Sequence, residues 1–269
     1  LFMFRVFLLL IGLPVWSLAQ SALTVPSLYP LGQQAYSQHF RDPFSLLANP
    51  AVLARTRSGF GLYSEHRFML RELYTMAFSV NWAQRRYGVG LLTNYFGNES
   101  YHHWQSSLCY GRSLGNIDLG ISIQITQQKV LGLKPQLSLQ SSIGLCYVIN
   151  EHWVTGFLLH NIWGRRLSSA SQLPIYRRVD WGWGYELSED LLLTASLRKI
   201  EDQPLAVIYT LEYRLPAHFF VRVGGDTGTA SRWIGVGGRR QHWQLVLMTQ
   251  YHGVLGYSPG VFLIYDPAQ

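Results

Sequence analysis

The feature that most constrains the fold is a strict alternation of apolar residues with polar residues or glycine. The clearest stretch runs from residue 117 to residue 126. One face carries Ile117, Leu119, Ile121, Ile123 and Ile125, and the other carries Asp118, Gly120, Ser122, Gln124 and Thr126. A period of two residues places successive side chains on opposite faces of a β-strand. The stretch therefore predicts a strand with one apolar and one polar face.

The same alternation recurs after residue 56 and predicts about fourteen antiparallel strands, with no amphipathic helix between them. Strands of about ten residues suit a tilted crossing of a membrane. The expected strands are 57–66, 71–83, 86–96, 101–113, 116–127, 136–149, 152–162, 177–188, 190–200, 204–214, 217–225, 230–239, 241–251 and 259–266.

An all-β chain with evenly spaced strands forms either a sandwich or a barrel. Here the inner face is polar or glycine, where a soluble sandwich would need an apolar core. Charged residues make up only 14% of the chain, against about 25% in soluble proteins. Aromatic rings stand at predicted strand ends, as at membrane interfaces. The sequence predicts an all-β transmembrane antiparallel β-barrel in the outer membrane of a Gram-negative bacterium.

The predicted connections alternate between tight turns and more open loops. The tight turns are 84–86, 114–116, 150–152, 188–190, 215–217 and 239–241. Outer-membrane barrels have short periplasmic turns and longer outer loops. We therefore expect the tight turns on the periplasmic side.

Residues 1–19 have the layout of a cleavable signal peptide. Arg5 supplies a positive charge, residues 6–15 are mostly apolar, and small residues stand at Ser17 and Ala19. Gln20 is then the first mature residue. The alternative of a membrane anchor is disfavoured, because the apolar run is shorter than the ~20 residues of a spanning helix.

Residues 20–56 lack the alternation and contain four prolines. The pair Asn49-Pro50 indicates a turn or the end of a helix. The segment is long enough to fold into the barrel mouth as a plug or hatch. The expected organisation is a signal peptide at 1–19, a plug-like segment at 20–56 and a barrel at 57–269.

The run Asn49, Pro50, Ala51, Val52, Leu53 and Ala54, just ahead of the first strand, resembles an N-terminal motif of the FadL-related fourteen-stranded barrels. That group includes the PorV and PorQ outer-membrane proteins of type IX secretion. The family usually has glycine where this chain has Val52, and a glycine-rich stretch before the motif is missing here. The resemblance implies a plug motif made of Asn49, Pro50, Ala51, Leu53 and Ala54.

Several charged residues fall on the inward face of predicted strands. Unpaired buried charges are costly, so a salt-bridge network that stiffens a narrow barrel is favoured over a polar conduit or a catalytic pair. The predicted lumen charges are Asp118, Asp180, Glu186, Arg198, Glu212, Arg214 and Arg222.

Other chemistries find little support. Cys109 and Cys146 are placed on strands four and six, about 10 Å apart, so two free thiols are expected. His102 and His103 lack a third well-spaced ligand, so no metal site and no cofactor are predicted.

The sequence contains no G-x-S-x-G nucleophile elbow, so this motif gives no indication of an enzyme. The net charge of +7 comes from scattered arginines, which disfavours nucleic-acid binding. The glycines at 235–238 lack a following helix, and on a strand they would let a plug approach.

Three functions remain open. The resemblance to PorV and PorQ implies a non-enzymatic barrel that assists protein export or surface attachment, with outer-membrane lipid and secretion-system or surface-anchoring proteins as partners. The alternative is a FadL-like channel for hydrophobic small molecules, which needs an apolar pocket or a gap in the wall at a kinked strand. A third is a structural outer-membrane protein. The polar inner faces favour the first slightly.

Overall fold

The structure is a computed structural model that describes residues 28–167 and 176–267. The predicted signal peptide lies outside the described residues and stays a prediction. Fourteen antiparallel strands close into one barrel, in which β1 also pairs with β14. The predicted fold is therefore confirmed. The strands are β1 Gly59–His66, β2 Tyr74–Gln84, β3 Tyr87–Gly97, β4 Tyr101–Leu114, β5 Ile117–Val130, β6 Gln136–Val148, β7 Trp153–Arg166, β8 Arg178–Ser188, β9 Leu191–Ile200, β10 Ala206–Arg214, β11 Phe219–Asp226, β12 Ser231–Arg240, β13 Trp243–His252 and β14 Gly256–Tyr265.

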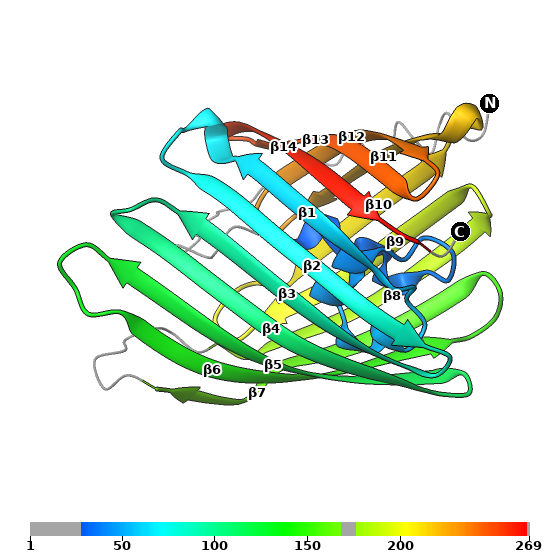
Figure 1. Cartoon of the computed structure of the whole chain (residues 1–269), viewed down its shortest axis with the longest axis horizontal. Coiled ribbons are helices and arrows are strands. Elements are labelled where there is room, and N and C mark those ends of the chain that lie inside the picture. The colour runs from blue at the N-terminus through cyan, green and yellow to red at the C-terminus, as the bar shows by residue number, and fades with distance from the viewer. Residues whose placement is uncertain (1–27, 168–175, 268–269) are drawn as a thin grey trace.

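The two ends of the barrel differ (Figure 1). At the end that we call the plug end, β1 begins, β14 ends and tight turns join β2 to β3 and β4 to β5. At the opposite end, which we call the loop end, the connections are mostly longer. The plug end is thus the side that the sequence assigns to the periplasm.

The apolar faces of the strands point away from the barrel interior. Leu108, Ile121, Ile123 and Leu247 keep between 52% and 63% of their surface exposed. A water-soluble protein with such a surface would aggregate, whereas lipid covers it at no cost. Among the described residues, no helix is both long and apolar enough to cross a bilayer.

Three strands extend further toward the loop end than the sequence indicates. β5 continues to Val130, β7 continues to Arg166, and β14 begins at Gly256 rather than at 259. The added residues of β5 and β7 include Lys129, Arg165 and Arg166, which end the apolar–polar alternation while the pairing continues. In β14 the added residues stand before Pro259, and proline is disfavoured inside strands.

Cys109 on β4 and Cys146 on β6 are free and buried, with β5 between them.

Inside the barrel lies the segment 28–56, drawn in blue in Figure 1, which we call the plug. It folds into four short 3₁₀ helices, η1 Tyr29–Leu31, η2 Gln33–Tyr36, η3 Pro43–Leu47 and η4 Pro50–Ala54. Phe44 of the plug packs edge-on against Phe262 of β14, with ring centroids 5.9 Å apart. Two short turns, η5 Arg67–Met69 and η6 Pro216–His218, link barrel strands.

Candidate functional site at the plug and the lumen wall

The five residues of the predicted plug motif all lie at η4 and are buried. Asn49 caps the helix, since its side-chain oxygen accepts a hydrogen bond of 3.0 Å from the backbone N–H of Ala51. Its Nδ2 donates to the carbonyl oxygens of Leu145 on β6, at 3.1 Å, and of Phe157 on β7, at 3.3 Å. Pro50 fits the first helical position, where no N–H is needed. Asn49 thereby ties the plug to the wall.

One side of the plug packs against glycines on β3 to β8, which we call the glycine side. A Cβ atom at Gly88 would overlap the carbonyl oxygen of Leu53, and one at Gly184 would overlap that of Tyr36. Cβ atoms at Gly120 and Gly144 would overlap the backbone of η4 and the side chain of Asn49. The plug therefore reaches the strands so closely that no side chain fits between them. The glycines at 235–238 do not have this role, because a Cβ at Gly235 would meet nothing closer than 3.5 Å.

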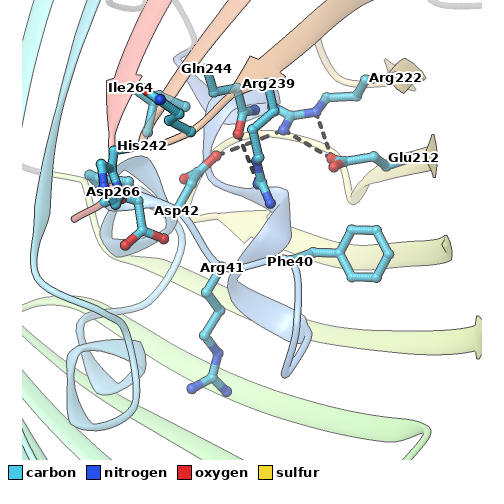
Figure 2. A pocket seen from close by; sticks show the side chains of 12 residues that line it. Phe40, Arg41, Asp42, Glu212, Arg222, Arg239, His242, Gln244, Ile264 and Asp266 are labelled. Atoms are coloured by element: carbon cyan, nitrogen blue, oxygen red, sulfur yellow. Dashed lines mark hydrogen bonds and ion pairs between the residues drawn. The ribbon is translucent and has the colours of Figure 1, made fainter. Parts of the chain in front are cut away.

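The opposite side of the plug meets charged residues on β10 and β11, which we call the charge side (Figure 2). Arg222 lies 2.9 Å from Glu212 and 3.8 Å from Asp42 of the plug. Gln34 of the plug donates a 3.0 Å hydrogen bond to Glu212. Burial raises the pKa of Asp42 to about 6, although Arg222 opposes the shift. These side chains form one buried network that spans plug and wall.

Three further contacts fasten the plug near its end of the barrel. Arg55 pairs with the fully buried Asp118 at 2.7 Å. Glu186 lies 2.6 Å from Nδ1 of His39 and accepts a hydrogen bond from the backbone N–H of Gln38. Arg214 stacks over the ring of Phe40 at 3.8 Å and donates to the carbonyl oxygen of His39.

The remaining two predicted lumen charges pair with each other beyond the plug. Arg198 lies 2.9 Å from Asp180, which also pairs with Arg178 at 3.0 Å. Five of the seven predicted lumen charges thus contact the plug, namely Asp118, Glu186, Glu212, Arg214 and Arg222. The sequence did not indicate their plug partners Asp42, Arg55 and His39, because that segment has no periodicity from which to infer a face.

The space left between the plug and the charge side is small. A cavity of about 20 Å³ lies there, lined by residues that include Asp42, Arg222, Arg239 and Asp266 (Figure 2). That volume holds about one water molecule. In this cavity the plug therefore leaves little free space against the charge side.

The wall of the barrel carries a β-bulge where β6 pairs with β7. The register of β6 with β7 shifts between Gln140 and Ser142, and Asn161 adopts φ 63° opposite this point. Pairing of β7 with β8 ends at His160 and Arg178, although β7 continues to Arg166. Nδ2 of Asn161 donates a 3.1 Å hydrogen bond to the carbonyl oxygen of Tyr176, which stands just before β8. A β-bulge bends the strand that carries it and disrupts the ladder locally, while pairing with β6 continues to Arg166.

A wide apolar groove lies on the lipid-facing surface, not in the lumen. Its volume is about 390 Å³, and it covers neighbouring strands β14, β1, β2 and β3. Leu62, Met76, Phe78 and Leu263 are among its lining residues. On this face of a membrane barrel, the acyl chains of the surrounding lipid fill such a groove.

No protein-family model matches the sequence, and the search of curated proteins finds no match. Solved structures are similar in fold. The CymD monoaromatic hydrocarbon channel aligns with a TM-score of 0.62 at 10% identity over 88% of this chain and 97% of that one. A Pseudomonas aeruginosa FadL homologue aligns at 0.59 with 11% identity, over 88% and 96%. A deltaS2 mutant of the TodX monoaromatic hydrocarbon channel aligns at 0.55 with 9% identity, over 86% and 98%. At these identities the likeness shows the fold alone.

Proposed function

We propose that this chain is an outer-membrane channel for small hydrophobic molecules, with the plug as its closed gate and the bulge in β7 as the place of its side exit. The observation that carries the proposal is the combination of a plug packed inside the barrel, which leaves only a small cavity beside Arg222, with a bulge at Asn161 that bends β7. A molecule that cannot pass straight through can leave sideways into the membrane. Only a solute that is soluble in lipid gains from such a route.

The FadL-like alternative thus replaces the export role as the preferred function. The structures of similar fold include two named as monoaromatic hydrocarbon channels, which supports a channel over an export partner. The bulge in β7 also supplies the kinked strand that such a transporter needs. Co-purification of the barrel with secretion-system or surface-anchoring proteins would reverse this order.

Uptake of labelled toluene tests the proposal in cells that express the full chain and lack other channels of this kind. We expect uptake several-fold faster than in cells without the protein. Asn161→Gly should retain it, because glycine adopts φ 63° freely, whereas the β-branched Asn161→Val should lower it by straightening the strand. A folded barrel that leaves uptake unchanged would refute the channel.

A further inference from the structure

Arg41 of the plug carries a buried guanidinium group that no other group neutralises at close range. Its side-chain nitrogens Nε, Nη1 and Nη2 are all buried, and none has a hydrogen-bond partner within the part of the chain that the structure describes. The side chain points away from the small cavity beside Arg222 (Figure 2). Among the described residues, no other arginine has all three nitrogens in this condition. The docked plug therefore holds one positive charge without a direct partner.

The wall carboxylates around Arg41 are engaged by other side chains of the plug. Arg55 pairs with Asp118 at 2.7 Å, and Nδ1 of His39 lies 2.6 Å from Glu186. Burial lowers the pKa of Arg41, and Asp118 and Glu186 oppose this shift only from a greater distance. Three basic side chains of the plug thus face two wall carboxylates, and Arg41 is the one left without a pair.

Two other arginines between plug and wall show the usual arrangement. Arg222 lies 2.9 Å from Glu212, and Arg55 has Asp118. In such pairs the attraction between the opposite charges offsets the loss of hydration, and removing one partner leaves the other buried alone. Removing the charge of Arg41 leaves no carboxylate without its partner. Its substitution should therefore have the opposite effect on docking from substitution of Arg222 or Arg55.

The unpaired guanidinium disfavours only the docked state of the plug. A buried charge without a hydrogen-bonded partner is strongly destabilising, because it loses its hydration and gains nothing in return. When the plug leaves the wall, water solvates the same group and the penalty disappears. Native proteins rarely keep such a group, and those that do concentrate local strain at switch regions. The position of Arg41 in the segment that closes the barrel fits that pattern.

From this arrangement we infer that Arg41 opposes docking of the plug and lowers the free energy that opening of the barrel requires. The inference rests on the proposed function only in that the plug is the gate. The pairs around Arg222 and the close packing on the glycine side favour the docked plug, and Arg41 offsets part of their effect. A ligand that favours the released plug then has to supply only the remaining difference in free energy between the two states.

Hydrogen exchange of residues 28–56 in the purified full chain, measured by mass spectrometry, tests the inference by the direction of the change. Arg41→Met keeps an unbranched side chain and removes the charge, so exchange should slow by about tenfold. Arg55→Met is the matched variant and should speed exchange, because it leaves Asp118 buried without its partner. Arg41→Leu repeats the measurement if the methionine variant does not fold. Unchanged or faster exchange in a folded Arg41 variant would overturn the inference.

A double variant separates the two opposing contributions to docking. Arg41→Met added to Arg222→Met should recover part of the protection from exchange that the Arg222 variant loses, and no recovery would contradict the role of Arg41. In cells, Arg41→Met should lower uptake of labelled toluene several-fold, because the gate opens less often. Toluene uptake by the wild type together with unchanged exchange in the Arg41 variant would refute this inference alone. Slower exchange in that variant without any uptake by the wild type would refute the channel alone.

Discussion

The plug meets the barrel in two different ways on its two sides. On the glycine side the plug and the wall are held by close packing. The backbone of η4 leaves no room for a Cβ at Gly120, and that of Tyr36 in η2 leaves none at Gly184. On the charge side the fit is made by buried ion pairs around Arg222. A close-packed contact loses about a quarter to a half of its dispersion attraction when the surfaces separate by about 0.5–1 Å. Ion pairs and hydrogen bonds can exchange for water, so we expect the plug to open first on the charge side.

Replacement of Arg222 by methionine tests the charge side most severely. It leaves Glu212 and Asp42 buried without their shared cation, and removing one partner of a buried pair costs about 3–5 kcal/mol. We expect faster hydrogen exchange in residues 28–56, measured by mass spectrometry, while the barrel stays folded. Arg240→Met at the exposed end of β12 is the control. Unchanged exchange in the Arg222 variant would mean that the network does not hold the plug.

A methyl group at Gly184 tests the glycine side. Because it would overlap the carbonyl oxygen of Tyr36, Gly184→Ala should destabilise the docked plug by about 3 kcal/mol. Gly235→Ala places the same methyl group where there is space and should cost little. The difference between the two variants in thermal unfolding measures the contact of shape. Equal melting temperatures would show that the plug does not lie this close to β8.

The pH dependence of plug docking sharpens the comparison, because only the charge side contains Asp42. Burial raises its pKa to about 6 from an ordinary value near 3.8. A carboxyl whose pKa is higher in the docked state stabilises that state at low pH and loses the effect as pH rises through 6. Docking should therefore weaken between pH 4 and pH 7 by at most about 3 kcal/mol. Asp42→Asn should remove this dependence from exchange rates measured across that range, and its persistence would assign it to another group.

Substitution of Asn49 has the smallest expected effect on stability, because its hydrogen bonds lie on the glycine side, where close packing holds the plug. Asn49→Ala removes the cap of η4 and the two hydrogen bonds to β6 and β7, at a cost of about 1–2 kcal/mol. A modest fall in melting temperature is expected, with the plug still docked. Complete release of the plug in this variant would show that hydrogen bonds, rather than shape, hold the glycine side.

Strand periodicity made the barrel predictable, because an apolar face toward lipid is visible in any stretch such as 117–126. The partners within the plug were not predictable, since Asp42 and Arg55 stand in a segment where no period assigns a face. The bulge at Asn161 was not predicted, because the expected strand 152–162 ends just after it and a bulge interrupts the alternation as a loop does.

The central claim is that the plug closes the barrel, and electrical recording tests it most directly. The purified full chain is inserted into a planar bilayer at neutral pH, and the ionic current is measured. With the plug in place we predict no sustained open steps, and we predict them only in variants such as Arg222→Met that release it. A wild-type protein that conducts ions continuously, as an open porin does, would contradict the account.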